Sequence, residues 1–422
     1  GAGADLIGET ASAKPAVCAG DDGVVAVRMS NRGRRVAALA TAAVIALCLP
    51  ACAGAPVAGP SASPSPSAQW RSVTTDPAAL RTRFAALAAE LGVPGAAMLV
   101  RTPDGEVTAT YGTTELHGST PVSLDDHFRI GSNTKTMTGT VILQLVQEGR
   151  IALTDKVSKY RPDVPNGSRI TIEQLLTMRS GLANYTTTLA LNTALDTQPQ
   201  RVWDPEELAA MGLAEPPLFP PGDGWAYSNT NTVLLGLIAE QLEQKPLAEI
   251  FQERLFTPLG RREPSYPAAD DAALPAPFSH GYMYSTNVDT METSELPPDQ
   301  LAQAKAGTLL PGDTTELNPS WAGAAGAGVS TIRDLAHWVE ALGGGGLLSP
   351  TLQRERLASV QPVPIPLPPL PDPQYGWGIA KIGPLYGHTG ELPGFNSFMG
   401  YDPEQKVTIV VLSLPGVIAE PC

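Results

Sequence analysis

Apolar residues recur along the chain with spacings that predict strands near both ends of the folded part and helices between them. After Asp76, apolar residues three or four positions apart predict a helix that stops at Gly92. Short apolar runs bounded by turn residues predict strands at 96–102, 107–111, 386–389, 396–401 and 407–414. Helical spacing predicts helices at 133–148, 172–178, 205–211, 232–243, 247–255 and 332–342.

Strands at both ends with helices between them predict a mixed α/β (α+β) fold. We expect one antiparallel sheet that is built from both chain ends and flanked by helices, with an inserted all-helical lobe. The folded domain is expected over residues 75–422. Its sheet lobe would comprise about 75–155 and 325–422, and its helical lobe about 156–324.

Two irregular stretches interrupt these patterns. Residues 262–320 are rich in Pro, Asp, Glu, Ser and Thr with little periodicity, and residues 361–373 are dominated by proline, which favours extended backbone. Loops of this length in a compact domain are more often functional or disordered than neutral. Two interpretations stay open for them, the wall of a substrate cleft and a simple surface excursion.

The first 74 residues have the pattern of a targeting segment followed by a linker. A short basic run, an apolar stretch and small residues predict an export signal over 29–52. Its end, Leu49-Pro50-Ala51-Cys52, resembles a bacterial lipobox in which Cys52 is lipidated, with plain secretion and a retained anchor as alternatives. Residues 1–28 are expected to be an upstream extension, and 53–74 a Pro, Ser and Ala-rich linker without a core. We therefore expect an extracytoplasmic protein, either a cell-membrane lipoprotein or a secreted one.

Composition narrows the possible chemistry. The 28 Lys+Arg against 42 Asp+Glu give a net charge of −14, which leaves no basic excess for phosphates and argues against nucleic acid as a partner. No cysteine lies between residues 53 and 421, and no His-Glu-x-x-His occurs. We therefore expect no metal site and no cofactor. The reactive groups must be hydroxyls, amines, carboxylates or single histidines.

A serine and a lysine stand three residues apart where a predicted helix begins. Ser132 and Lys135, in Ser-Asn-Thr-Lys, would share one helix face, so that the lysine amine leans back over the hydroxyl. Serine needs a base within hydrogen-bond distance, and burial disfavours a charged lysine. We interpret the pair as a nucleophile and its proton acceptor. A capping serine with a solvated lysine is the alternative, because Ser-x-x-Lys alone is a weak motif.

A second group of polar side chains follows a Pro-Gly turn. Tyr227 and Asn229, in Tyr-Ser-Asn, would project from a short loop on the same side. The phenol can relay protons when a nearby ammonium lowers its pKa. The amide of Asn229 would donate to a substrate carbonyl. A capping loop with a core tyrosine is the alternative.

A third group lies on a predicted strand near the C-terminal end, in His388-Thr389-Gly390-Glu391. A glycine in a strand lets a ligand or another backbone approach closely. Thr389 would bind a substrate carboxylate, and the backbone N–H of Glu391 would pair with that of Ser132 as an oxyanion hole. A histidine satisfied within the strand is the alternative for His388.

The three motifs, in this order, resemble those of the serine β-lactamase and penicillin-binding protein family: Ser132-x-x-Lys135, Tyr227-x-Asn229 and His388-Thr389-Gly390. Over residues 78–414 the sequence looks most like the branch of class C β-lactamases, low-molecular-weight DD-carboxypeptidases and related esterases. Class A relatives have Ser-Asp-Asn where this chain has Tyr-Ser-Asn, so their deacylating glutamate is not expected. Relatives usually end in a helix after the last strand, whereas only eight residues follow Leu414 here, which suggests a truncated or altered end.

The resemblance implies an acyl-enzyme mechanism. Ser132 attacks a carbonyl, Lys135 and Tyr227 shuttle the proton, and water or an amine resolves the ester. The backbone amides of Ser132 and Glu391 hold the oxyanion. The implied substrate-binding residues are Asn229, His388, Thr389 and Gly390.

The expected activity follows from the third motif together with the predicted export signal. His388 replaces the lysine common in class C β-lactamases, which favours a D-alanyl-D-alanine carboxypeptidase-like peptidase outside the cytoplasm. An esterase and a β-lactamase are the second and third interpretations, and a catalytically silent cell-envelope binding protein is the alternative from another class. The expected partners are a small-molecule, peptide or ester substrate and, through Cys52, the cell envelope.

Overall fold

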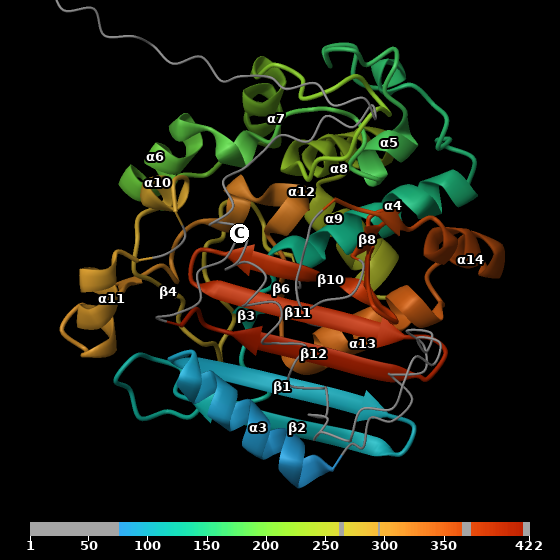
Figure 1. The fold of residues 1–422 in the computed structure, drawn as a ribbon. Coiled ribbons are helices and arrows are strands. Elements are labelled where there is room, and N and C mark those ends of the chain that lie inside the picture. Colours follow the sequence, from blue (N-terminus) through green and yellow to red (C-terminus); the bar gives the residue numbers. More distant parts are fainter. Residues whose placement is uncertain (1–75, 261–265, 294–295, 365–372, 417–422) are drawn as a thin grey trace, which may run out of the picture.

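The computed structural model describes most of the chain from residue 76 onward (Figure 1). The described residues are 76–260, 266–293, 296–364 and 373–416. The expected upstream extension, the export signal with Cys52 and the linker lie outside them. Residues 365–372, within the second irregular stretch, also lie outside. The division of the chain into two lobes stays a prediction.

Eight strands form one antiparallel sheet in the order β2-β1-β12-β11-β10-β9-β8-β7 (Figure 1). The strands are β1 (Gly95–Thr102), β2 (Gly105–Gly112), β7 (Gln361–Pro362), β8 (Gln374–Tyr375), β9 (Ala380–Ile382), β10 (Leu385–Leu392), β11 (Phe395–Asp402) and β12 (Val407–Ser413). The first hairpin pairs with the last strand, with Ala97 opposite Leu412. This pairing confirms the predicted sheet built from both chain ends.

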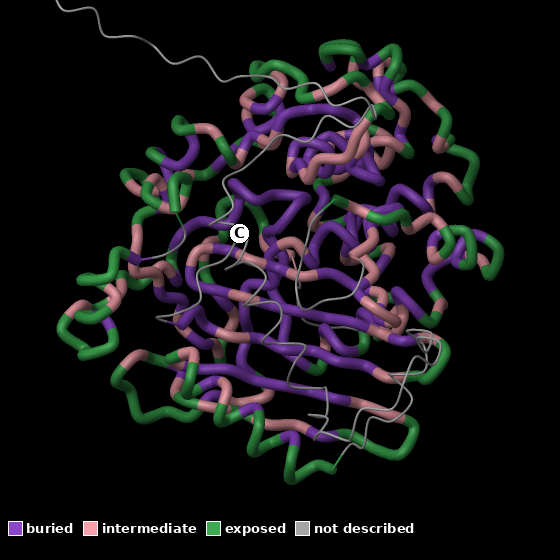
Figure 2. The backbone as a smooth tube through the Cα atoms, viewed as in Figure 1, coloured by how far each residue is buried: buried purple, intermediate pink, exposed green. Residues whose placement is uncertain are grey.

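Both faces of the central strands are buried (Figure 2). Successive residues of β1 alternate between two hydrophobic clusters, because neighbouring side chains of a strand point to opposite faces. Ala97 and Leu99 belong to the larger cluster on the helical side. Met98 and Val100 belong to the smaller one together with Phe84 of α3 (Pro77–Glu90), which lies across β1 and β2 in Figure 1. The strand is therefore apolar from Ala96 to Val100.

The helices that cover the other face come from the middle of the chain. They include α4 (Thr134–Gln147), α5 (Ile172–Leu176), α6 (Leu189–Thr197), α7 (Pro205–Ala214), α8 (Asn229–Glu243), α9 (Leu247–Phe251), α12 (Gly323–Gly326), α13 (Ile332–Gly344) and α14 (Pro350–Ala358). Every helix predicted from apolar spacing is present, whereas α6, α12 and α14 were not predicted. No helix within the described ranges combines the length and the apolar character that a membrane span requires.

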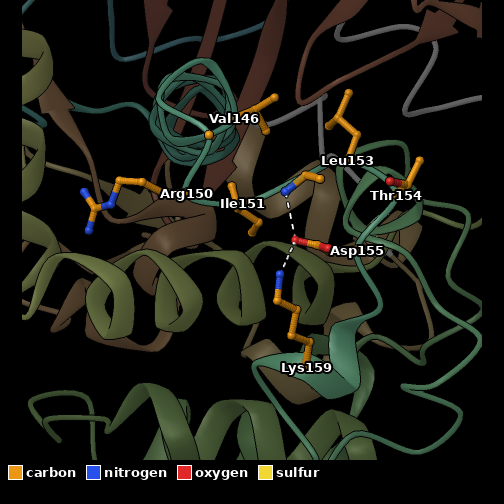
Figure 3. A pocket seen from close by; sticks show the side chains of 9 residues that line it. Val146, Arg150, Ile151, Leu153, Thr154, Asp155 and Lys159 are labelled. Carbon is orange, nitrogen blue, oxygen red and sulfur yellow. Dashed lines mark hydrogen bonds and ion pairs between the residues drawn. The ribbon is translucent and has the colours of Figure 1, made fainter.

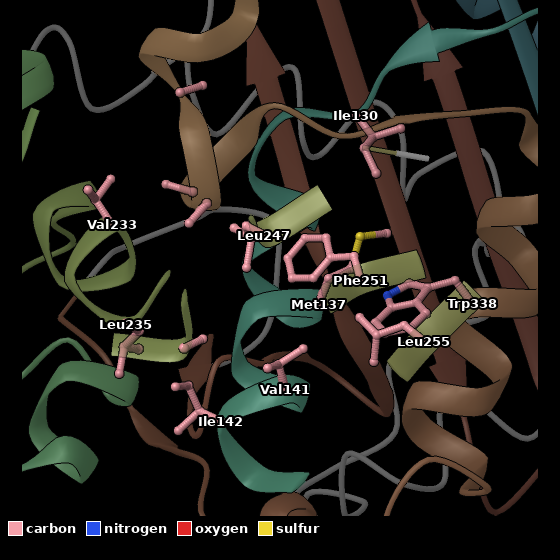
Figure 4. Packing of buried hydrophobic residues seen from close by; sticks show 14 of the residues in the cluster. Ile130, Met137, Val141, Ile142, Val233, Leu235, Leu247, Phe251, Leu255 and Trp338 are labelled. Carbon is pink, nitrogen blue, oxygen red and sulfur yellow. The ribbon is translucent and has the colours of Figure 1, made fainter. Parts of the chain in front are cut away.

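Helix α4 lies in the middle of the larger cluster (Figure 4). Its Met137, Val141 and Ile142 are buried and share this cluster with Leu247 and Phe251 of α9. Fully burying one such side chain contributes about 1.5–3 kcal/mol to stability. These contacts on several sides fix the rotation of α4, and with it the direction of the side chains at its N-terminus.

The inserted region is not wholly helical. Within the described parts of 262–320 lie α10 (Asn287–Thr290), α11 (Pro298–Lys305) and a two-stranded ladder of β4 (Tyr282–Met283) and β5 (Gly312–Asp313). The region is anchored where Asp196 of α6 accepts from the backbone N and the side-chain amide of Asn287, both at 2.7 Å. Strands β3 (Phe128–Arg129) and β6 (Val329–Ser330) pair where the chain enters and leaves the helices.

Candidate active site

Ser132 lies in one turn of 3₁₀ helix, η2 (Gly131–Asn133), that runs directly into α4. Asn133 ties this turn to the sheet. Its side-chain amide donates to Ile130 O at 2.9 Å and to Ser397 Oγ of β11 at 2.7 Å. The serine is therefore held at the start of the helix, where the sequence placed it.

Lys135 lies on the next helical turn, and its amine reaches back to the serine. Lys135 Nζ donates to Ser132 Oγ at 2.9 Å and to the backbone oxygen of Ala325 at 2.8 Å. Burial holds the pKa of this lysine well below its usual range, because a charged ammonium loses its hydration there. A neutral amine has a lone pair, so at this distance it can accept the serine proton.

Four buried threonines follow one another at every second position of α4 and tie the helix to its neighbours. Thr136 Oγ1 accepts from Trp338 Nε1 at 2.9 Å, and Thr140 Oγ1 accepts from Arg356 Nη1 at 2.6 Å. Thr138 Oγ1 donates to a carbonyl of α12 at 2.7 Å. Because each hydroxyl is both buried and bonded, the helix cannot shift without leaving polar groups unpaired.

Tyr227 and Asn229 approach the same place from the start of α8. The ring centroid of Tyr227 lies 4.9 Å from Lys135 Nζ and 6.2 Å from the ring of His388. Asn229 is the first residue of α8, and its Nδ2 donates to Thr186 Oγ1 at 3.1 Å. The structure thus brings the predicted second motif next to the first.

Strand β10 passes very close to the serine turn. A Cβ on Gly390 would come 1.9 Å from Ile130 O, and a Cβ on Gly131 would come 2.4 Å from Glu391 N. Only glycine allows two backbones to approach this closely. The backbone of Glu391 is therefore beside the turn that carries Ser132, where the predicted oxyanion hole requires it.

His388 is buried at the same junction, and both of its ring nitrogens have partners. Nδ1 lies 2.5 Å from the backbone oxygen of Thr389, and Nε2 lies 3.2 Å from Tyr375 Oη. Burial, and secondarily the charge of Lys135, lowers the pKa of His388 to about 3. The imidazole is therefore neutral at pH 7, unlike a lysine in the same position. Thr389 is half-buried beside it.

A small cavity of about 40 Å³ opens beside the serine. Three of the predicted site residues, Ser132, Asn229 and Glu391, line it. Its other walls include Thr186, Trp321 and Leu392, so the residues just after the first irregular stretch contribute to it. Segments far apart in the sequence thus converge on one space around the serine hydroxyl.

A larger hollow of about 390 Å³ lies at the C-terminal end of α4, away from the serine (Figure 3). Its acid, Asp155, accepts from Lys159 Nζ and from the backbone N of Ala152, each at 2.9 Å. The hydroxyl of Tyr160, followed by these two donors, lowers the pKa of Asp155 to about 2. The hollow therefore holds a carboxylate that is already paired with its lysine, so size does not identify the reactive site here. In the part of the chain that the structure describes, no cluster of His, Cys, Asp and Glu side chains is suited to a metal ion.

The family model described as Beta-lactamase matches residues 80–414, which is most of the chain. The chain belongs to the beta-lactamase family. This finding confirms the resemblance inferred from the three motifs and makes the protein a serine hydrolase.

One solved structure and two curated proteins illustrate what this chain is similar to. A crystal structure of a D-stereospecific amidohydrolase from Streptomyces sp. is 31% identical, covers 82% of this chain and 96% of its own, and superposes with a TM-score of 0.67. A penicillin-binding protein of Bacillus subtilis (strain 168) is 24% identical over 72% of this chain and 64% of its own. The D-alanyl-D-alanine-carboxypeptidase/endopeptidase AmpH of Escherichia coli (strain K12) is 32% identical over 43% of this chain and 47% of its own. The chain thus spans less than two thirds of the length of these curated relatives.

Sequence reasoning missed several residues of this beta-lactamase family site. Tyr375 touches His388, and Thr186 binds the side chain of Asn229. The carbonyl of Ala325 accepts from the lysine amine. Only Tyr375 could have been found from the sequence, because it begins the segment Tyr-Gly-Trp-Gly, which lies a short interval before the third motif. The other two contacts come from segments without any motif.

We expect Gly131→Ala to slow acylation much more than Gly149→Ala does. Both glycines have left-handed backbone, with φ of 51° and 70°, so each alanine introduces similar strain of order 1 kcal/mol. Only the new Cβ at 131 meets the backbone of Glu391, whereas the one at 149 meets open space. The acylation rate and the melting temperature of both variants test this. Equal losses of rate would show that the contact with β10 has no role.

Proposed function

We propose that this chain hydrolyses amide bonds through an acyl-enzyme on Ser132, most closely as a D-alanyl-D-alanine carboxypeptidase-like peptidase. The observation that carries the proposal is the buried amine of Lys135 at 2.9 Å from Ser132 Oγ. A base of lowered pKa next to a serine is what nucleophilic catalysis at neutral pH requires. The same pair argues against the catalytically silent binding protein.

In the proposed acylation, Ser132 Oγ bonds to the substrate carbonyl carbon while its proton passes to Lys135 Nζ. The oxyanion that forms accepts hydrogen bonds from the backbone N–H groups of Ser132 and Glu391, each worth about 3–4 kcal/mol in the transition state. Tyr227, whose ring lies beside the lysine amine, passes the proton to the leaving nitrogen as the C–N bond breaks. The amine product then departs.

In the proposed deacylation, water adds to the ester carbonyl and gives one proton to Lys135, with Tyr227 as the relay. The C–O bond to Ser132 breaks, the proton returns to Oγ, and the acid product leaves. Asn229 and Thr389 position the substrate during both halves, with Gly390 allowing its close approach. His388 supports these substrate-binding residues from the buried side, as a neutral ring and not as a cation.

The D-amino-acid preference of the proposal draws on the relatives. The Streptomyces protein is named a D-stereospecific amidohydrolase, and the Escherichia coli protein a D-alanyl-D-alanine-carboxypeptidase/endopeptidase. A substrate with a D residue at the scissile carbonyl is therefore the first to test.

A D-amino acid amide is the second candidate substrate, and one observation favours it. A carboxypeptidase must bind the free carboxylate of its substrate, which lysine or arginine usually does. Among the described residues that line the cavity, none is a lysine or an arginine, and His388 is neutral. An amide substrate needs no such cation.

A panel of substrates separates these activities. We expect turnover of a D-Ala-D-Ala peptide and of a D-amino acid amide, with L enantiomers at least about tenfold slower, or ~1.4 kcal/mol in transition-state binding. A p-nitrophenyl ester and nitrocefin measure the esterase and β-lactamase activities on the same preparation. Preference for L substrates would overturn the D-specific assignment, and nitrocefin as the best substrate would make the chain a β-lactamase.

The location is part of the same proposal. The predicted export signal and Cys52 would place the hydrolase outside the cytoplasm, tethered to the cell envelope through a lipid. That location fits D-amino-acid peptides as substrates.

A further inference from the structure

Tyr375 is the residue of β8 that joins the third motif to the rest of the site. Its side chain is buried, and its ring packs edge-on against Tyr227 at 6.4 Å and against His388 at 5.6 Å between centroids. Its hydroxyl lies 3.2 Å from His388 Nε2. Tyr375 thus contacts two predicted site residues without lining the cavity itself.

The partners of His388 determine which of its nitrogens carries the proton. Nδ1 faces the backbone oxygen of Thr389 at 2.5 Å, and a carbonyl oxygen can only accept, so Nδ1 must be the protonated nitrogen. In a neutral ring Nε2 then holds a lone pair. The hydroxyl of Tyr375 is therefore the donor and Nε2 the acceptor.

The charged and titratable groups around the imidazole agree with this assignment. When Lys135 of α4 is protonated it disfavours a positive charge on the imidazole, and Tyr227 faces the ring from the loop before α8. Burial raises the pKa of Tyr375, so its phenol stays protonated and remains a donor. Behind it, Arg356 of α14 has a pKa lowered to about 9 by burial and stays charged at pH 7.

We propose that Tyr375 is a positioning residue for acylation, because its hydroxyl holds His388 as a neutral imidazole protonated on Nδ1. The catalytic part of this inference rests on the proposed acyl-enzyme function, whereas the assignment of the proton does not. The role of the neutral ring follows from the charge that develops during acylation. When Ser132 gives its proton to Lys135, a positive charge appears on the amine, and a nearby imidazolium would repel it.

The first arm of the test compares Tyr375→Phe with Tyr386→Phe, a tyrosine of β10 whose ring lies under Lys381. Tyr375→Phe removes the donor to Nε2 and so disfavours the neutral imidazole, although burial and Lys135 still lower the pKa of His388. We expect the acylation rate of Tyr375→Phe, relative to the wild type, to be lower at pH 5.5 than at pH 8.

The matched control and the KM values separate an effect on the imidazole from an effect on packing. Tyr386→Phe should follow the wild-type pH profile, and the KM of Tyr375→Phe should change little because Tyr375 does not line the cavity. A loss in Tyr375→Phe that is the same at every pH would show packing rather than control of the imidazole, and would overturn the proposal.

The second arm measures the proton directly in the full wild-type chain. Nitrogen-15 chemical shifts of the histidine rings, with the His388 signals assigned by their absence in His388→Gln, should show Nδ1–H from pH 5 to 8. An Nε2–H or a charged ring would overturn the proposal even if Tyr375→Phe fails to fold. If instead the ring is as expected but no probe acylates Ser132, the proposed function fails while the assignment of Tyr375 as donor stands.

Discussion

Ser132→Ala is expected to remove covalent labelling and to lower turnover by about 10⁴-fold or more, since loss of a serine nucleophile costs up to ~10⁶-fold in a related type of site. The hydroxyl is the only group removed, and Asn133 keeps its backbone hydrogen bond to Ile130 O and its side-chain bond to Ser397. A fluorescent fluorophosphonate and a fluorescent penicillin, each added to parent and variant, measure the effect directly.

Ser168→Ala provides the control for this experiment, because Ser168 is exposed in a loop far along the chain from the serine turn. It should be labelled at Ser132 as fast as the parent. Equal labelling of the parent and of Ser132→Ala would remove Ser132 from the mechanism. A parent that binds peptide but is never labelled would instead support the silent binding protein.

Lys135→Met is expected to lower the acylation rate by about 10²–10⁴-fold, which is the usual contribution of a general base. Methionine fills a similar volume without an amine, so Ser132 keeps its position and loses its proton acceptor. Stopped-flow labelling of the parent and the variant measures this step alone. Lys156→Met, which removes an exposed lysine, should leave the rate unchanged.

The same substitution should increase the free energy of unfolding at pH 7. The folded state holds Lys135 with a lowered pKa, so between that pKa and the ordinary value of about 10.4 the unfolded chain binds more protons. Burial of this lysine therefore destabilises the protein at neutral pH, and the penalty shrinks as the pH rises toward 10.4. Denaturant unfolding of parent and variant at pH 7 and pH 10 should show a difference that narrows. A less stable variant at pH 7 would contradict this account of the lysine.

The sequence predicted the fold and the motifs well because both depend on local patterns. Apolar spacing located α4 and the terminal strands within a few residues, and the Ser-x-x-Lys spacing on a helix placed Lys135 over Ser132. The pairing of β1 with β12 followed from strands at both ends of the chain. Each of these inferences needs only the spacing of side chains along a helix or strand and one assumption about how these elements are connected.

The rest depends on contacts between distant segments. No sequence pattern near Gly390 indicates that the backbone of Gly390 lies in van der Waals range of Ile130 O. The state of His388 could not be predicted either, since it depends on burial and on the hydroxyl of Tyr375. Sequence reasoning placed His388 where relatives have a lysine and kept a histidine satisfied within the strand as the alternative, and the structure shows a neutral ring with both nitrogens engaged.

The pairing of β1 with β12, and of the serine turn with β10, has a consequence for protein synthesis. A ribosome makes Ser132 and Lys135 before β10 and β12, so the nascent polypeptide contains the proposed nucleophile before the backbone that completes the proposed site. Long-range closure of this kind is slow, because it waits on segments far apart along the chain. A chain interrupted by a stop codon before Glu391 would carry Ser132 and Lys135 and yet lack the backbone that lies against the serine turn, so we expect no activity until β10 has been translated.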